Sequence, residues 1–191
     1  LALDYLTKLD VSSGRLNVIL TRLLIVNQIN HAIVGREHID FNGIVDDVLL
    51  LEKKKGLPER LEIKIEIDAE INFQSDKDLV RIILENLIDN SIKFYNDSER
   101  IKPFVHIKIA VQNNEDVVVS VIDNGIGIAE AKPDKIFQMF SRASERSGTG
   151  GIGLYLSKLA TEKLGGQINQ RSTAEGYTEF YVSFPLKMQA S

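Results

Sequence analysis

Two asparagines spaced one helical turn apart are the first residues whose chemistry suggests a ligand. Asn86 and Asn90 fall in a segment that we predict to be helical over residues 76–94, and both lie on or beside its packed face. Because Mg²⁺ accepts one or two protein oxygens together with waters and phosphates, the Asn90 amide is a candidate metal ligand. Lys93, one turn later, can reach a phosphate. Taken alone, such a pair more often hydrogen-bonds to nearby backbone.

A carboxylate follows the most apolar predicted strand. Asp123 stands directly after residues 117–122, and Gly125 and Gly127 come next. A carboxylate buried at a strand end can accept the amino hydrogens of adenine, and glycines let the backbone pass close to a ring. Ordinary turns also use this Asp-x-Gly-x-Gly pattern, so by itself it is weak.

A glycine-rich stretch leads into a second predicted helix over residues 153–164. Backbone N–H groups in such a loop and at a helix start bind phosphate. The stretch lacks the closing Gly-Lys-Ser/Thr of a Walker loop and does not have the Rossmann spacing. A flexible linker is the alternative. The candidate phosphate-binding residues here are Gly148, Thr149, Gly151, Gly153 and Leu154.

The remaining periodicity supplies the elements that would position these residues. A helix ending near Gly56 precedes an alternating strand, and further strands follow on both sides of the polar loop. The predicted strands cover residues 61–67, 105–111, 117–122, 167–172 and 178–184. Helices grouped with a mixed or antiparallel sheet predict an α/β two-layer sandwich.

The first part of the chain has a different character. Over residues 16–33 apolar side chains recur every three or four positions, which is the spacing of a helix that packs on another helix. We expect residues 1–9 to be the end of a partner helix and residues 10–14 to be a turn. The division predicted is a helical region over 1–38 and a second domain over 39–191.

Composition narrows the class of protein. The 191 residues are 43% hydrophobic with a net charge of -4, which fits a globular domain and gives no basic surface for nucleic acid. There is no cysteine, and no apolar run reaches the roughly 18 residues of a membrane span. Because the sequence starts without methionine, we expect it to be part of a longer protein.

The order of an Asn-bearing helix, an Asp-Gly turn and a glycine loop resembles the Bergerat-type ATP-binding fold. Histidine kinases, type II topoisomerases, a heat-shock chaperone and mismatch-repair ATPases share it as the GHKL superfamily. Residues 86–94 are similar to the histidine-kinase form of the first motif, and residues 136–140 to the phenylalanine motif in the kinase lid. The resemblance covers residues 41–186. It implies the catalytic domain of a two-component sensor histidine kinase, with a mobile ATP lid over about 129–150.

The resemblance assigns roles residue by residue. It implies that Asn90 binds Mg²⁺, that Asn86 and Lys93 contact the phosphates, and that Asp123 binds adenine in a pocket shaped by Gly125 and Gly127. The glycine loop would bind phosphate, although its first glycine departs from the family pattern. The resemblance also gives three lid residues: Phe137 and Phe140 as anchors and Arg142 as a contact of the γ-phosphate.

The same resemblance implies partners outside the sequence. ATP would donate a phosphoryl group to a histidine on a dimerisation helix, and a response-regulator receiver domain would take it on. His31, His38 and His106 lack the acceptor setting of the family, so the acceptor would lie on an upstream helix of the same or the partner subunit. We therefore expect Mg-ATP binding without self-labelling. The parent protein would be a homodimer anchored in the bacterial inner membrane, with this domain in the cytoplasm.

Two other functions remain open at this point. An ATP-hydrolysing clamp would need a general-base carboxylate, and Glu85 immediately precedes Asn86. A non-catalytic nucleotide-binding or dimerisation scaffold would account for the irregular glycine loop.

Overall fold

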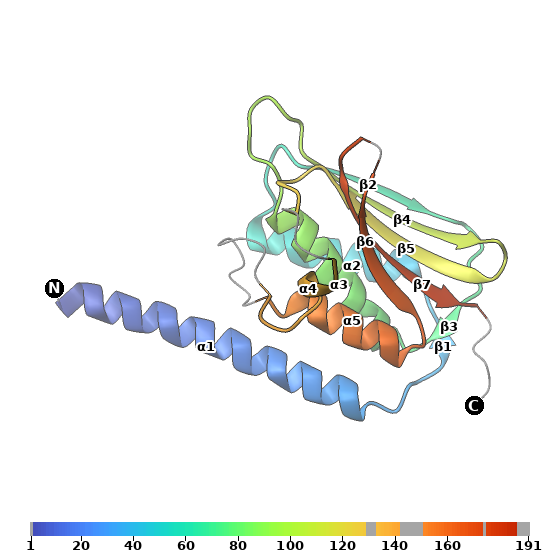
Figure 1. Ribbon diagram of the computed structural model, residues 1–191, viewed down its shortest axis with the longest axis horizontal. Coiled ribbons are helices and arrows are strands. Elements are labelled where there is room, and N and C mark those ends of the chain that lie inside the picture. Colours follow the sequence, from blue (N-terminus) through green and yellow to red (C-terminus); the bar gives the residue numbers. More distant parts are fainter. Residues whose placement is uncertain (1, 129–132, 142–150, 174, 187–191) are drawn as a thin grey trace.

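The computed structural model describes residues 2–128, 133–141, 151–173 and 175–186 (Figure 1). Its first element is one long helix, α1 (Ala2–His31), which runs along the rest of the molecule and projects beyond it. The predicted turn at residues 10–14 is wrong, because the helix continues through it. A single interior glycine, Gly14, costs a helix only about 1 kcal/mol, too little to end it.

A five-stranded mixed sheet forms the centre of the fold. Its strand order is β2-β4-β5-β7-β6; β2 and β4 are parallel and the other pairs are antiparallel. The predicted strands are all present, and β5 takes the central position expected of the most apolar one. The bounds are β2 (Glu62–Ile67), β4 (Phe104–Gln112), β5 (Asp116–Asp123), β6 (Gln167–Ser172) and β7 (Thr178–Pro185).

Three helices cover one face of this sheet (Figure 1): α2 (Phe41–Gly56), α3 (Lys77–Lys93) and α5 (Gly153–Lys163). Asp40 and Asp76 begin the first two as N-caps, because their carboxylates accept from Gly43 N and Leu79 N. The apolar faces of these helices and of the sheet form one buried core. The prediction of an α/β two-layer sandwich is confirmed.

The structure contains short elements that periodicity did not predict. β1 (Glu37–His38) pairs antiparallel with β3 (Gln74–Ser75), and α4 (Pro133–Ile136) is a single turn. Two-residue strands and one-turn helices are too short to show a repeat in the sequence. β1 falls in the region 1–38 but pairs with a strand from the second region.

The C-terminal half of α1 is docked on α5. Ile29 is only 1% exposed, and Lys163 Nζ donates to the carbonyl of Asn30 at 2.9 Å. Other large apolar side chains of α1 are exposed in the described structure, whereas Ile19 and Val26 of the predicted seam pack against the core. The exposed side chains include Tyr5, Leu6, Leu9, Leu16, Leu20 and Leu24. None of the described helices has the length and apolarity needed to cross a membrane.

Candidate functional site

The three sequence motifs meet at one cavity between α3, the end of β5 and the start of α5. Helix α3 contributes both asparagines and Lys93, because residues four and three positions apart lie on one side of a helix. Asp123 and Gly127 line the cavity from the end of β5, and Gly151, Gly153 and Leu154 line it from the start of α5. The other lining residues are Asp89, Phe94, Ile126, Ile128, Ile136, Ser141, Thr178 and Phe180.

Asp123 is buried at the end of the central strand, and both of its carboxylate oxygens are hydrogen-bonded. The residue is 5% exposed, and its carboxylate accepts hydrogen bonds from Ser91 Oγ at 2.9 Å and from Gly125 N at 3.0 Å. Burial raises the pKa of this carboxyl, and the two hydrogen bonds oppose that rise. The arrangement presents an oriented acceptor to the cavity.

The two glycines after Asp123 serve different purposes. Gly127 lines the cavity and has φ +72°, a left-handed backbone that favours glycine. Gly125 is required by the packing of the chain: a Cβ there would lie 2.3 Å from the carbonyl oxygen of Phe94 at the end of α3. The same carbonyl accepts from Ile126 N at 3.0 Å. Gly125 therefore lets the strand end close against α3.

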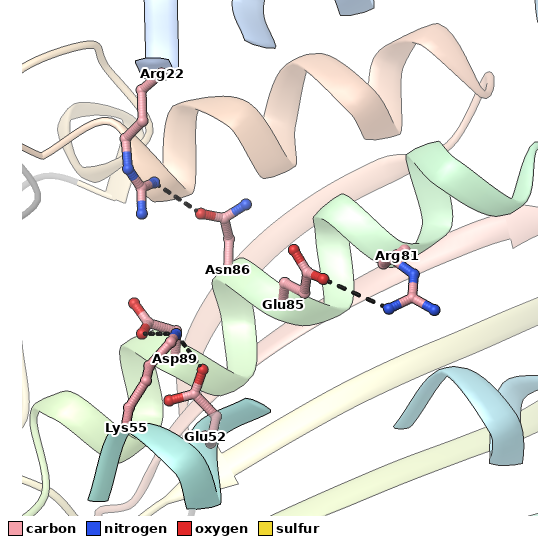
Figure 2. Close-up of polar contacts among 7 residues, drawn as sticks. All are labelled: Arg22, Glu52, Lys55, Arg81, Glu85, Asn86 and Asp89. Carbon is pink, nitrogen blue, oxygen red and sulfur yellow. Dashed lines mark hydrogen bonds and ion pairs between the residues drawn. The ribbon is translucent and has the colours of Figure 1, made fainter. Parts of the chain in front are cut away.

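Asn86 has both ends of its amide engaged. Nδ2 donates to the carbonyl of Ile82 at 2.7 Å, and Oδ1 accepts from Arg22 Nη1 at 3.0 Å. Figure 2 shows Arg22 reaching from α1 toward this amide on α3. The sequence did not predict Arg22, since nothing in the spacing of α1 shows which residue of a distant helix it meets.

Asn90 lies one turn further along α3 and also lines the cavity. Its side chain makes no hydrogen bond to any residue that the structure describes, so its amide oxygen can accept a cation. No group of three His, Cys, Asp or Glu side chains suitable for a metal occurs among the described residues. The single amide oxygen of Asn90 fits Mg²⁺ held by one or two protein oxygens and by the oxygens of a ligand.

Lys93 supplies positive charge at the same wall. Burial lowers the pKa of its ammonium group; attraction by Asp89 opposes this, and repulsion by Arg22 and Lys55 adds to it. Figure 2 shows three of these neighbours, Arg22 on α1, Lys55 on α2 and Asp89 on α3, with Lys55 paired to Asp89. A partly desolvated cation beside another cation favours an anionic ligand.

Glu85 lies away from this cavity. It lines a neighbouring groove between α1, α2, α3 and α5, and it pairs with Arg81 at 3.8 Å (Figure 2). Burial raises the pKa of the Glu85 carboxyl. A general base for attack on a phosphate in the cavity would have to lie within it.

The structure describes only part of the predicted loop and lid. Gly151 has φ +71° and packs tightly, since a Cβ there would lie 2.2 Å from the carbonyl oxygen of Ser141. Gly148, Thr149 and Arg142 lie outside the described residues, so their roles stay predictions.

The two lid phenylalanines behave differently. Phe137 is 7% exposed and meets Phe180 of β7 edge to face, with ring centroids 6.3 Å apart. Phe140 is 52% exposed with φ +64°, and its role as a lid anchor stays a prediction.

Sequence reasoning did not identify the wall contributed by β7. Thr178, which is buried, stands opposite Asp123 in the strand register, and Phe180 stands opposite Val121. The alternation in residues 178–184 predicted the strand but carries no information on its neighbour. Ile126 and Ile128 were passed over because isolated apolar residues in a loop have no periodic signal.

A mixed-sheet sandwich with its cavity at the end of the central strand has the architecture of the ATPase class that the motifs resemble. The model of one family, the histidine kinase-, DNA gyrase B-, and HSP90-like ATPases, matches residues 75–188. That match covers more than half of the sequence, and the chain belongs to this family.

The chain is similar to known sensor proteins over a small part of their length. It is 28% identical to the sensor protein GacS of Pseudomonas syringae over 96% of this chain and 21% of GacS. It is 29% identical to the signal transduction histidine-protein kinase ArlS of Staphylococcus epidermidis over 86% of this chain and 36% of ArlS. The chain thus spans well under half of either relative.

Solved structures share the fold. Full-length ShkA in complex with AMPPNP matches with a TM-score of 0.74 at 22% identity, covering 98% of this chain and 39% of ShkA. The histidine kinase AdeS of Acinetobacter baumannii gives 0.73 at 19% identity over 96% of this chain and 82% of AdeS. The catalytic domain of histidine kinase ThkA gives 0.66 at 23% identity over 80% of this chain and 98% of that domain.

Proposed function

We propose that this chain binds Mg-ATP in the cavity and transfers the γ-phosphoryl group to a histidine, as the catalytic domain of a sensor histidine kinase. The observation that carries the proposal is the convergence of three motifs, far apart in sequence, on one cavity. Family membership and the likeness to sensor proteins support it.

The proposed binding mode follows from the two ends of the cavity. At one end Asp123 is an acceptor for the amino group of adenine, because Ser91 and Gly125 fix its two oxygens. At the other end the start of α5, Asn86 and Lys93 surround the phosphates, with backbone N–H groups and positive charge. The nucleotide then spans the cavity from β5 to α5.

Asn90 would hold the metal ion. When bound, Mg²⁺ neutralises charge on the phosphate oxygens. Asn90 is available for this role because its amide makes no hydrogen bond among the described residues. The Asn90 carbonyl then fixes the phosphate chain relative to α3, and Lys93 stabilises negative charge at the same wall.

The transfer needs a nucleophile from outside the cavity. An unprotonated imidazole nitrogen attacks the γ-phosphorus, an N–P bond forms, and the bond to the oxygen bridging the β-phosphate breaks to release ADP. No histidine of the described residues lines the cavity. His106, for example, lies on β4 beside Glu66, with Nε2 and Oε2 3.2 Å apart. We propose that the acceptor belongs to a dimerisation helix in the same or a partner subunit.

The same proposal assigns residues 1–38 to the end of the dimerisation and phosphoacceptor region and residues 39–191 to the catalytic domain. The exposed apolar side chains of α1 support a helical partner, and a homodimer would supply one. A receiver domain would accept the phosphoryl group next. Anchoring of the parent protein in a membrane stays a prediction.

Incubation with γ-labelled ATP tests the proposal. We expect the chain to bind Mg-ATP in calorimetry, not to label itself, and to label a separately supplied acceptor helix. Asn90→Ala should abolish that labelling. Strong self-labelling at His31, His38 or His106 would refute the assignment of the acceptor, and steady ATP hydrolysis without any acceptor would favour the clamp function instead.

A further inference from the structure

An arginine of α1, which lines the neighbouring groove, contacts Asn86 in the wall of the cavity. Arg22 lies on α1, 64 positions before Asn86 in the sequence, and its Nη1 donates to Asn86 Oδ1 at 3.0 Å. Figure 2 shows its guanidinium directed from α1 at this amide. Of the side chains in this contact, Asn86 lines the cavity itself.

The guanidinium also lies against the start of α5. A Cβ on Gly153 would be 2.9 Å from Asn86 Oδ1 and 3.3 Å from Arg22 Nη1. Glycine at this position therefore leaves room for the pair of side chains. Because Gly153 is the first residue of an 11-residue helix, Arg22 stands beside the positive end of the α5 dipole.

The charge of Arg22 is not matched by a carboxylate in contact. Among the described residues, no carboxylate lies within ion-pair distance of its guanidinium. The neighbouring acids have other cations: Lys55 pairs with Glu52 at 2.5 Å and with Asp89 at 3.4 Å (Figure 2). Burial lowers the pKa of Arg22, and attraction by Asp89 opposes this only from a longer distance.

Two cations and a helix start therefore face one region, an arrangement that an anion would stabilise. Arg22 and Lys93 are both partly desolvated, and Arg22 lowers the pKa of Lys93 through repulsion. Charge-assisted hydrogen bonds from arginine to phosphate oxygens are strong, and the guanidinium has donors left after its bond to Asn86.

We propose that Arg22 completes the polyphosphate site, holding the amide of Asn86 and placing a positive charge of α1 beside the terminal phosphates. This inference rests on the proposed ATP binding. It makes the docking of α1 on α5 and the binding of nucleotide mutually stabilising, since coupling between two binding events is reciprocal. The helical region is then part of the nucleotide site and its position responds to occupancy.

The test compares nucleotides that differ in phosphate number. Binding of Mg-ATP, Mg-ADP and adenosine is measured by calorimetry for the wild type, Arg22→Gln, Arg22→Lys and the control Arg36→Gln. Arg36 is exposed and lies outside the cavity lining, so its substitution removes the same charge elsewhere. We expect Arg22→Gln to weaken ATP binding about tenfold, the scale of one charge-assisted hydrogen bond, and ADP binding less. Adenosine binding should not change, and Arg22→Lys should recover part of the loss.

The coupling has its own readout. In the wild type, Mg-ATP should slow amide hydrogen exchange of α1 around Arg22 more than adenosine does, and Arg22→Gln should remove that difference. Equal loss of ATP and adenosine binding would show a merely structural role and overturn the inference. Unchanged or tighter ATP binding by Arg22→Gln would overturn it too. If the wild type binds no ATP, the proposed function and this inference are both rejected. If the wild type binds ATP and Arg22→Gln binds it equally well, only this inference is rejected.

Discussion

Asp123→Asn separates nucleotide binding from folding. The carboxylate uses one oxygen for Gly125 N and the other for Ser91 Oγ. In the variant the remaining oxygen must stay with Gly125 N, because an amide NH₂ facing that N–H would place two donors together. The NH₂ then takes the place of the second oxygen, and Ser91 can turn its hydroxyl to accept from it.

The loss should therefore fall on adenine. The amino group of adenine then faces the NH₂ of the asparagine, a donor, in place of the ionised carboxylate of Asp123, an acceptor. Removal of one charge-assisted hydrogen bond costs about 2 kcal/mol, or about thirtyfold in affinity. Calorimetry with Mg-ATP measures this. Asp116→Asn, at the opposite end of β5, is the matched control and should bind normally.

The stability of Asp123→Asn should stay equal to that of the wild type or rise, although its affinity for ATP falls. Burial raises the pKa of Asp123 above its unfolded value, so the ionised carboxylate destabilises the folded state, and stability falls as pH rises through the folded pKa. Asparagine removes that cost, and the midpoint of urea unfolding at pH 7 should stay equal or rise. Unchanged ATP affinity would reject the adenine assignment. A parallel loss of affinity and stability would refute the reasoning about the hydrogen bonds.

Three further substitutions probe other parts of the site and the sheet. Gly125→Ala should lower stability by about 1–3 kcal/mol in urea unfolding, because its Cβ would lie 2.3 Å from the carbonyl oxygen of Phe94. Asn90→Ala should weaken ATP binding about tenfold or more with Mg²⁺ and leave metal-free binding unchanged in EDTA; equal loss in both would reject a metal role. Arg171→Ala removes a 2.6 Å partner of the buried Glu179. Burial raises the pKa of that carboxyl, but hydrogen bonds from Arg171 and Ser120 lower it overall. At pH 7 the variant should be less stable than the wild type by about 1 kcal/mol, and this difference should shrink as pH falls through the folded pKa of Glu179. An equal difference at pH 7 and below that pKa would contradict the ion pair.

The periodicity of the sequence predicted the main helices and strands and their order along the chain. The fourfold spacing that carries Asn86 and Asn90 also marks the buried face of α3, so the sequence located the helix and its polar residues together. The apolar run before Asp123 predicted a central strand for the same reason. Both signals come from residues close in sequence, which is where periodicity is informative.

Contacts between distant segments were not predictable in this way. Thr178 stands opposite Asp123 only because β7 pairs with β5, and Arg22 meets Asn86 only because α1 docks on α5. The continuous α1 differs from the turn predicted at residues 10–14, a stretch that includes the weak helix former Gly14. Its local cost is small against a helix of 30 residues.

Gly125 and Gly153 are needed for the packing of the protein backbone as well as for a nucleotide site. Gly125 closes the end of β5 on the carbonyl of Phe94, and Gly153 leaves room for the amide of Asn86. In both cases a glycine of one motif packs against the helix that carries another. A larger side chain at either position would therefore separate β5 or α5 from α3 and open the cavity from its walls. The motifs occur together because each provides the surface on which the next one packs, and the geometry of the cavity follows from those backbone contacts before any ligand binds.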